Sequence, residues 1–356
     1  RLCRRLAEVA CAWRQNFDPQ LWARLARDKC STLIKEAREA VPAIDFVQQH
    51  LKELDERDGK ITIVDLCSGL GFLAMFLSEL LPPERVDVCL LLDQAWPLKG
   101  SKGDITEPGQ SSKGRTRLNW DHIYNIHWPI PLVTRRCNLK LPSTHLQILS
   151  RLLEPAPGPV IILGIHLCGL LSIRAIETFN RGPKCVAFAL KPCCLPSMHY
   201  AQRQVRWTLG CHTFAAAEVC CWGNYHHNRW TGPVKATMAP RFRCWAEHLH
   251  RGIQGSCKAI SRVELVEGHY QDTYLFASRP FSVSQSIPPE ASPKAMAMEA
   301  ARQILEAEVP FRTLSVPDDV SMRQLRRRVG CLTKVLGSDD YNDEPDIAAA
   351  FQKIQV

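Results

Sequence analysis

The amino-acid sequence predicts an α/β protein built on a seven-stranded, mostly parallel sheet that ends in an antiparallel hairpin. Three observations support this fold class. Short apolar runs alternate with helical patterns, as in parallel sheets that are covered on both faces. The first run leads into a glycine turn that opens a helix. Two β-rich runs near the end are separated by a short polar turn, which predicts the hairpin.

The composition indicates a globular, intracellular protein. Of its 356 residues, 46% are hydrophobic and 23% are charged, which is typical of a chain that buries a core. No apolar run reaches the roughly 18 residues that a membrane span requires. Many of the cysteines lie in apolar strands, as small buried side chains of a reducing compartment do. Because the chain begins at Arg1, cytoplasm, nucleus and organelle all stay open.

Residues 1–58 are predicted to form a helical extension in front of the first strand. Apolar residues recur there at helical spacing: Leu33, Ala37, Val41, Phe46 and Leu51. This periodicity predicts one or two helices between residues 21 and 54.

Residues 59–281 are predicted to form the α/β domain. The predicted strands are 61–69, 85–96, 130–140, 158–169 and 185–194, and the predicted helices are 70–81, 143–154 and 170–182. The helix at 70–81 is ended by Pro82–Pro83, and the helix at 170–182 is closed by Gly182. Ser143 is a candidate N-cap of the helix at 143–154. Residues 97–117, rich in glycine, serine and lysine, are predicted to be a loop.

The rest of the chain divides into an insertion, a hairpin and a tail. Residues 197–260 are predicted to be an insertion above the carboxyl ends of the strands, where open α/β sheets bind ligands. The hairpin is predicted from residues 262–270 and 272–281. Residues 282–356 are predicted to be a linker followed by a helical, amphipathic tail.

The glycine turn after the first strand is compatible with two ligands. It reads Asp65-Leu-Cys-Ser-Gly69-Leu-Gly71, and its glycines let the backbone approach a ligand closely. Ala74 is tolerated where a dinucleotide fingerprint has its third glycine. The glycine pattern therefore excludes neither NAD nor S-adenosylmethionine.

Two carboxylates favour S-adenosylmethionine over NAD. Asp65 would repel a pyrophosphate but can hold the ammonium group of S-adenosylmethionine. Asp93 ends the second strand, where a carboxylate can accept both ribose hydroxyls. Asn138, after the third strand, can accept a hydrogen bond from the adenine amino group through its amide oxygen. We expect the turn residues Cys67 and Ser68 to line the same site. The alternatives are a helix-capping role for Asp65 and a solvated strand end for Asp93.

Three motifs resemble a family of Rossmann-fold methyltransferases: "VDLCSGLGFL", "GIHLCGLLSIRAIETFN" and "FALKPCC". The family includes the eukaryotic tRNA acceptor-stem 2′-O-methyltransferases and related methyltransferase-like proteins, and the resemblance covers residues 61–280. It implies a Rossmann-like class I methyltransferase fold. It implies S-adenosylmethionine binding through Asp65, Gly69, Gly71 and Asp93.

The same resemblance places His166, Cys168 and Gly169 at the mouth of the site. The chain departs from the family in two places. It lacks the N-terminal Cys/His zinc modules of the tRNA enzymes, and Lys191-Pro-Cys193-Cys194 stands where those enzymes have "CCHH". The methyl donor is therefore better supported than a tRNA substrate.

His166 and Lys191 are the candidate catalytic residues, and His166 is also a candidate cofactor contact. They lie near the ends of strands four and five, at the edge of the sheet that binds ligands. Methyl transfer depends mainly on positioning, and an oxygen acceptor benefits from a group that takes its proton. The alternatives are a structural histidine bonded to a loop carbonyl and a lysine that is solvated or binds substrate phosphate.

The cysteines and histidines leave two further alternatives. RNA cytosine-C5 methyltransferases use a cysteine nucleophile in places comparable to Cys168, Cys193 and Cys194, but their sequence contexts are absent here. Buried or pocket-wall cysteines are the favoured interpretation. The insertion could hold zinc, yet no Cys or His pair there has the usual ligand spacing. No metal site is predicted.

The sequence predicts an S-adenosylmethionine-dependent methyltransferase that acts on RNA, with the ribose 2′-oxygen of tRNA as one candidate acceptor. The net charge of +9 permits contact with nucleic acid. Aromatic and basic residues of the insertion suit base stacking and phosphate binding: Trp207, Trp222, Trp230, Trp245, Arg206, Arg229, Arg241 and Arg243. A small satellite core and solvated basic faces are the alternatives. The alternative functions are a protein or small-molecule methyltransferase and a catalytically silent RNA-binding subunit.

Overall fold

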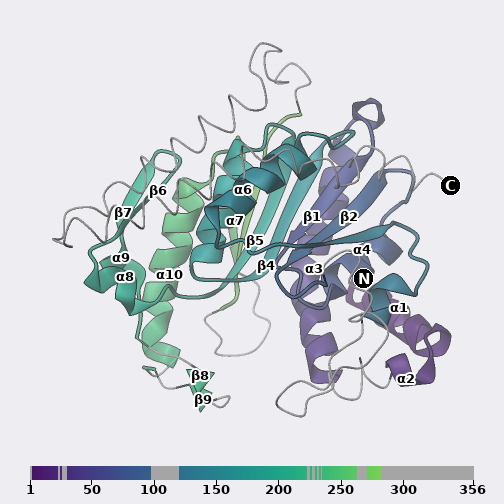
Figure 1. The fold of residues 1–356 in the computed structure, drawn as a ribbon, viewed down its shortest axis with the longest axis horizontal. Helices are drawn as coiled ribbons and strands as arrows, with labels where there is room; N and C mark the ends of the chain where they lie inside the picture. The colour runs from purple at the N-terminus through teal and green to yellow at the C-terminus, as the bar shows by residue number, and fades with distance from the viewer. Residues whose placement is uncertain are drawn as a thin grey trace, which may run out of the picture. The chain divides into compact units, whose positions relative to one another are not determined.

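The computed structural model describes residues 2–22, 25, 30–97, 120–222, 225–226, 229–230, 232–233, 235–262 and 271–281 (Figure 1). All of these belong to one compact unit, Arg1–Ser286. Three sequence predictions lie wholly or largely outside the described residues. They are the loop at 97–117, the hairpin strand at 262–270 and the tail at 282–356.

A seven-stranded sheet with the order β10-β11-β5-β4-β1-β2-β3 forms the centre of the fold (Figure 1). Its strands are β1 (Ile61–Leu66), β2 (Val86–Asp93), β3 (Leu132–Arg136), β4 (Val160–Cys168), β5 (Cys185–Cys194), β10 (Cys257–Arg262) and β11 (Thr273–Ser278). The first five are parallel, while β11 runs antiparallel to both β5 and β10. The Rossmann-like methyltransferase topology predicted from the sequence is therefore confirmed.

Helices cover the sheet in two groups. In one group α3 (Cys30–Glu53) packs on α1 (Leu2–Asn16) and α4 (Phe72–Leu80), and in the other α6 (Pro142–Ile148) and α10 (Lys235–Gly252) pack on α7 (Leu170–Arg181). Figure 1 shows α6 and α7 lying over one face of the sheet. Alternate strand residues such as Ile61 and Ile63 join the core of the first group, as the two-residue period of a strand requires.

The N-terminal helices are an integral part of this core. Trp13 of α1 stacks on Phe76 of α4 at 4.7 Å between ring centroids, and its indole nitrogen donates to Glu79 over 3.1 Å. The short helix α2 (Pro19–Trp22) follows α1, and a 3-10 turn, η2 (Glu56–Asp58), precedes β1.

The helical pattern predicted between residues 21 and 54 corresponds mainly to α3. Of the residues that carry this pattern, Leu33 and Leu51 are buried, and Ala37, Val41 and Phe46 are half-buried. The innermost positions of the helix are Ala43, Ile44 and Val47, each 0% exposed.

Two boundaries were wrong in the sequence analysis. Ser143 is not the N-cap of α6, because the helix begins at Pro142 with Leu141 at the cap. Proline fits the first helical position, where its fixed φ is already helical and no backbone donor is needed. The first hairpin strand, β10, begins at Cys257, inside the segment that was assigned to the insertion.

Short elements complete the described chain. They are α5 (Asp121–Tyr124), the π-helical turn η3 (Leu149–Leu153), α8 (Met198–Gln202), β6 (Arg206–Leu209), β7 (His212–Ala215), α9 (Ala216–Val219), β8 (Tyr225–His226) and β9 (Arg229–Trp230). Strands β6 and β7 form one small hairpin, and β8 and β9 form another. No helix in the described ranges is both long and apolar enough to cross a bilayer.

Candidate active site

The turn between β1 and α4 has an unusual backbone. Cys67, Gly69 and Gly71 have φ values of 57°, 56° and 82°, a left-handed region that side chains with a Cβ rarely occupy. A Cβ on Gly71 would lie 2.8 Å from Leu91, whereas one on Gly69 would meet nothing within 4 Å. Gly71 is therefore required by packing, and the exposed face of Gly69 is free for a ligand.

Asp65, the penultimate residue of β1, precedes this turn and is 3% exposed. Its Oδ2 atom has no hydrogen-bond partner among the described residues. Burial, followed by the negative charges of Glu36 and Asp93, raises the pKa of Asp65 well above its usual range. A buried, unpartnered carboxylate is costly unless a cation or donor compensates it. The predicted ammonium contact would supply that compensation.

Asp93, at the end of β2, is held beside the turn by two backbone donors. Its Oδ2 accepts from the amide of Gly69 over 3.2 Å, and its Oδ1 accepts from the amide of Ala95 over 2.8 Å. Because each carboxylate oxygen has further acceptor capacity, the ribose hydroxyls could still bind there. The structure thus brings Asp65, Gly69 and Asp93 together, as the sequence analysis expected.

The other predicted cofactor residues are engaged in local bonds. The Ser68 hydroxyl accepts a hydrogen bond from the indole of Trp96 over 3.0 Å, which links the turn to Trp96. The Cys67 thiol is largely buried, and burial raises its pKa to about 12, so it stays protonated at neutral pH. Asn138 lies two residues beyond β3, and its Oδ1 accepts from the amide of Lys140 over 3.1 Å.

His166 lies where β4 bulges. The register between β4 and β5 shifts on either side of Leu167, and His166 has a φ of 68°. Bulges re-aim side chains near the ends of strands. Here the Nε2 atom of His166 contacts Glu39 and lies 4.0 Å from Glu36.

The charge state of His166 is set by opposing influences. Burial, then the charges of Lys191 and Lys35, lower its pKa to about 3. The charge of Cys168 acts in the opposite direction and raises the pKa of His166 by less. His166 is therefore neutral near pH 7, which leaves a ring nitrogen able to accept a proton.

Lys191 is 2% exposed, and its Nζ lies 3.1 Å from Oε1 of Glu39. The backbone carbonyl of the same Glu39 accepts a hydrogen bond from the hydroxyl of Tyr274 over 2.9 Å. In this position Lys191 balances a buried carboxylate rather than facing solvent. Its catalytic role stays a prediction.

Glu36 and Glu39 of α3 were missed by the sequence analysis. Glu39 is 7% exposed, and burial together with the charge of Glu39 raises the pKa of Glu36. The available signal was their spacing of three residues, which places both carboxylates on one face of α3. It was overlooked because α3 precedes the domain that carries the recognisable motifs.

Three cysteines converge at the ends of β4 and β5. The Sγ atom of Cys168 lies 3.1 Å from that of Cys193 and 3.5 Å from that of Cys194, and the last two are 3.6 Å apart. All three are free thiols. Hydrogen bonds from the other two thiols lower the pKa of Cys168, and the bonds with Cys168 raise the pKa values of Cys193 and Cys194.

In the insertion, the predicted aromatic and basic residues are divided between two settings. Trp245 is fully buried, and the ring centroid of Trp207 lies 6.1 Å from that of Trp245, whereas Trp222 is 59% exposed. Arg241 donates to the carbonyl of Cys220 over 2.6 Å. Trp230 and Arg229 form part of β9. The insertion therefore contains both a small core, which was one alternative, and exposed groups.

Histidines in the insertion form a chain of polar contacts. His212 and His248 share a hydrogen bond of 2.8 Å, and His248 lies 3.2 Å from Glu218. Among the residues that the structure describes, two groups have metal-binding geometry, namely the three cysteines and Glu36–Glu39–His166. Neither lies in the insertion.

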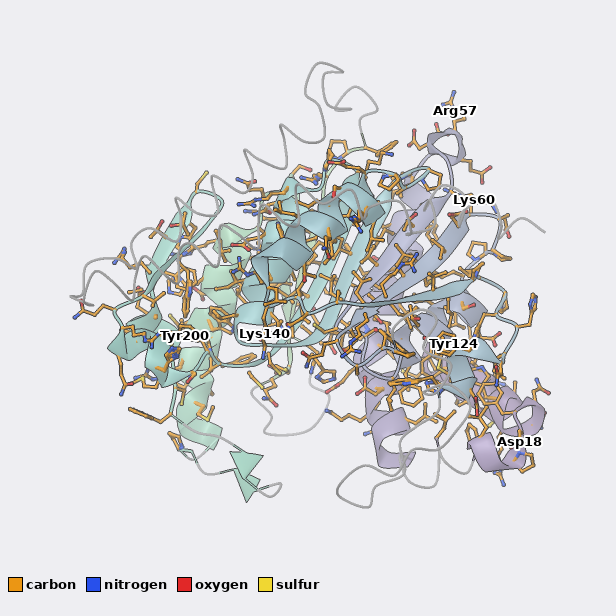
Figure 2. All side chains as sticks on the ribbon, in the orientation of Figure 1. Asp18, Arg57, Lys60, Tyr124, Lys140 and Tyr200 are labelled. Carbon is orange, nitrogen blue, oxygen red and sulfur yellow. The ribbon has the colours of Figure 1, made fainter. Side chains whose placement is uncertain are left out.

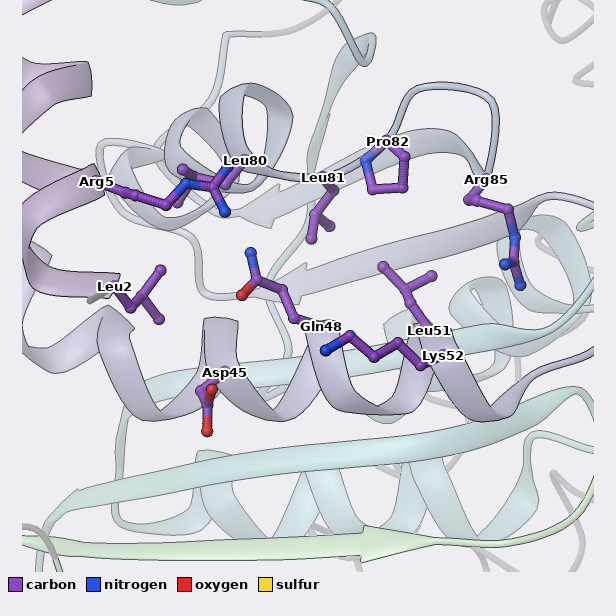
Figure 3. A pocket seen from close by; sticks show the side chains of 10 residues that line it. All are labelled: Leu2, Arg5, Asp45, Gln48, Leu51, Lys52, Leu80, Leu81, Pro82 and Arg85. Atoms are coloured by element: carbon purple, nitrogen blue, oxygen red, sulfur yellow. The ribbon is translucent and has the colours of Figure 1, made fainter.

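Figure 2 marks the two ends of the sheet, with Lys60 just before β1 and Lys140 beyond β3 at the opposite, carboxyl end. The candidate residues near the ends of β1, β2, β4 and β5 lie at the carboxyl end, where open α/β sheets bind ligands. A cavity of 510 Å³ lies elsewhere, at the far end of α4 from the glycine turn, and is lined by residues of α1 and α3 and by Leu80 and Leu81 (Figure 3). It is separate from the candidate site.

The topology and the turn define the class of Rossmann-type methyltransferase folds. No family model and no curated protein matches the chain. Among solved structures, it is similar to a Listeria monocytogenes protein described as an S-adenosylmethionine dependent methyltransferase. The TM-score is 0.31 and the identity 13%, over 65% of this chain and 97% of that one. An O-methyltransferase family protein from Burkholderia thailandensis is similar with a TM-score of 0.25 and 11% identity, over 69% of this chain and 59% of that one. Both likenesses are too weak to assign an activity.

Proposed function

We propose that this protein is an S-adenosylmethionine-dependent methyltransferase that acts on RNA. The observation that supports the methyl donor most directly is the unpartnered Oδ2 atom of Asp65. Asp65 precedes a glycine turn in which a Cβ on Gly69 would meet nothing within 4 Å. A cation at this point would compensate the buried carboxylate, and S-adenosylmethionine carries an ammonium group where NAD carries a pyrophosphate.

The residues present fit this cofactor. Asp65 would hold its ammonium group, Gly69 would allow close approach of the backbone, and Asp93 would accept the ribose hydroxyls. Asn138 would contact the adenine. When bound, S-adenosylmethionine supplies an electrophilic methyl group on a sulfonium. The protein contributes chiefly by fixing the positions of donor and acceptor.

His166 is the group proposed to take the proton from a hydroxyl acceptor. It is neutral near pH 7 because burial and two lysines lower its pKa to about 3. Glu39 and Glu36 contact or approach its Nε2 atom and would stabilise the positive charge that the ring acquires with the proton. Lys191 would hold the Glu39 side chain in place.

RNA is proposed as the acceptor, with the ribose 2′-oxygen as the candidate atom. The chain carries a net charge of +9, which favours an anionic polymer. The insertion exposes Trp222 as well as Arg206 and Arg243, side chains that stack on bases and bind phosphates. A protein or a small molecule is the alternative acceptor.

A catalytically silent RNA-binding subunit is the second candidate function. One observation favours it: Glu39 contacts both His166 and Lys191, the two candidate catalytic residues. If these contacts persist when RNA is bound, no free base faces the acceptor. The donor site would then serve stability or partner binding rather than transfer.

Two measurements test the proposal. Calorimetry of the full chain should show binding of S-adenosylmethionine and no binding of NAD. Asp65→Ala should weaken S-adenosylmethionine binding by about tenfold to a hundredfold, the value of one charge-assisted hydrogen bond. Asp45→Asn, an exposed carboxylate of α3, should leave the affinity unchanged and serves as the control.

Transfer of tritiated methyl groups to RNA, protein and metabolite fractions then identifies the acceptor. Label in RNA is expected. Label only in protein or in metabolites would refute the RNA proposal. Cofactor binding without label in any fraction, with cellular function intact in Asp65→Ala, would favour the silent subunit.

A further inference from the structure

We propose that Cys168, Cys193 and Cys194 form a zinc site with three protein ligands and an open fourth position. This inference does not depend on the proposed methyltransferase activity. It rests on the convergence of three thiols from two adjacent strands at the carboxyl end of the sheet.

The spacing of the sulfur atoms suits one shared metal ion. The three Sγ–Sγ distances are 3.1, 3.5 and 3.6 Å. Tetrahedral zinc with Zn–S bonds of about 2.3 Å separates its sulfur ligands by roughly 3.8 Å, so only a slight opening of the cluster is needed. A disulfide requires about 2.05 Å, and it would pair two of the thiols and exclude the third.

The fold explains why the sulfurs converge. Adjacent residues of a strand normally point to opposite faces, so Cys193 and Cys194 would not meet one thiol in a regular sheet. The register shifts on either side of Leu167: His166 is the extra residue of β4, Cys193 is the extra residue of β5, and Cys168 then pairs with Cys194. Bulges that re-aim side chains next to functional sites are a recurrent feature of sheets.

The backbone around the cluster is fixed by bonds that do not use the sulfurs. The carbonyl of Cys193 accepts from the side-chain amide of Gln271, and the carbonyl of Cys194 accepts from the amide of Gly169 over 3.2 Å. Such outer contacts hold metal ligands in position. The three thiols are therefore presented by a rigid frame.

The exposure of the cluster indicates an open site. Cys193 is buried, Cys194 is intermediate and Cys168 is exposed. Among the described residues, no fourth ligand atom completes the group. Structural zinc sites have four protein ligands, whereas three ligands and an exchangeable water are typical of reactive sites. We assign the fourth position to water or to an incoming donor atom.

Zinc is favoured by the chemistry of the ligands. Thiolates are soft donors that select zinc or copper(I) over magnesium, calcium and manganese. The second group with metal-binding geometry, Glu36–Glu39–His166, is less suited to a metal, because the ammonium group of Lys191 already lies 3.1 Å from Glu39.

The test measures metal content. The full chain is produced in zinc-supplemented medium and purified without chelators under reducing conditions, and its metals are quantified by mass spectrometry. About one zinc ion per chain is expected, as for a mononuclear site. Cys168→Ser and Cys193→Ser should lose most of it. Cys211→Ser, an exposed cysteine in the turn between β6 and β7, should keep it.

Circular dichroism checks that each variant is folded, and exposed Cys168 offers a substitution that disturbs no core. Cobalt-substituted protein should show thiolate-to-cobalt absorption, and this absorption should change when 2-mercaptoethanol enters the open position. Folded wild-type protein without zinc, copper in its place, equal zinc in Cys168→Ser, or a disulfide within the cluster would overturn the zinc assignment. An unchanged cobalt spectrum with added thiol would overturn the open position.

Discussion

At the scale of single residues, the candidate site is dominated by buried charge. Asp65, Glu39 and Lys191 are all at most 7% exposed. Side chains of this kind are rarely buried unless they are paired or functional. Lys191 and Glu39 compensate each other, whereas Asp65 has an oxygen with no partner in the described part of the chain. The two cases lead to opposite expectations for substitution.

Asp65→Asn should stabilise the protein while weakening cofactor binding. Burial raises the pKa of Asp65, so its contribution to stability is fully present below the unfolded pKa and is lost as pH rises through the folded pKa. The advantage of the uncharged variant should therefore grow from pH 5 to pH 8. Thermal unfolding at both pH values measures it. An advantage that shrinks with rising pH would contradict the assignment of Asp65 as the strained group.

The pair formed by Glu39 and Lys191 should behave in the opposite way. Lys191→Met leaves a buried carboxylate without its cation and should cost about 3–5 kcal/mol of unfolding free energy. The double variant Glu39→Leu with Lys191→Met removes both charges and should recover much of that loss. Urea denaturation of the two single variants and the double variant gives the coupling. Additive losses would show that the two side chains do not stabilise each other.

At the scale of elements, the glycine turn combines a packing role and a binding role in two residues. Gly71→Ala should lower the unfolding free energy by about 1–3 kcal/mol, because Leu91 and Ile123 must move. Gly69→Ala should cost about 1–2 kcal/mol from backbone strain alone, yet weaken S-adenosylmethionine binding at least tenfold by filling the open face.

Gly210→Ala is the control for the backbone strain of Gly69→Ala. The φ of Gly210 is 56°, equal to that of Gly69, but Gly210 lies in the turn between β6 and β7. The variant should lose stability through this strain and through contact of the new Cβ with the side chain of Gln254, which would lie 3.0 Å away, but it should keep its affinity for S-adenosylmethionine. Calorimetry and denaturant unfolding separate the two effects. Unchanged affinity in Gly69→Ala would mean that the open face does not contact the cofactor.

The order of the elements could be predicted from sequence because the parallel strands β1, β2, β4 and β5 are largely apolar. Strand β3, Leu132–Arg136, is apolar only at its start. The strand predicted at 185–194 coincides with β5, and the one at 61–69 contains β1. The ends of the elements were harder to place where two neighbouring residues both suit a boundary. Pro142 and Ser143 are both good residues for a helix start, and the sequence does not show which one begins α6.

The candidate site was predictable only in part, for a similar reason. Asp65 and Asp93 follow from the strands that carry them, since parallel strands end at one edge of the sheet. Glu39 and Lys191 are 152 residues apart in the chain, and no local pattern connects them. The three cysteines meet through register shifts between β4 and β5, which alternation of apolar residues does not reveal.

At the scale of the whole molecule, the positive net charge leads to a prediction about how RNA binding depends on salt. If RNA is bound mainly through phosphates, raising the salt from about 50 to about 200 mM should weaken binding at least tenfold. Arg206→Glu and Arg243→Glu, both exposed in the insertion, should weaken it further. Lys60→Glu, at the amino end of the sheet (Figure 2), should have little effect. Fluorescence anisotropy with labelled RNA measures these changes, and binding that is insensitive to salt would exclude a phosphate-based surface.

The bond between Tyr274 and Glu39 has a consequence for how the chain folds during synthesis. It joins residues 235 positions apart, and β11, which carries Tyr274, lies between β5 and β10 in the sheet. At about 5–20 residues per second, a ribosome needs on the order of tens of seconds to deliver β11 after α3 has emerged. During that interval the nascent chain exposes one side of β5, a hydrogen-bonding edge that chaperones would have to shield.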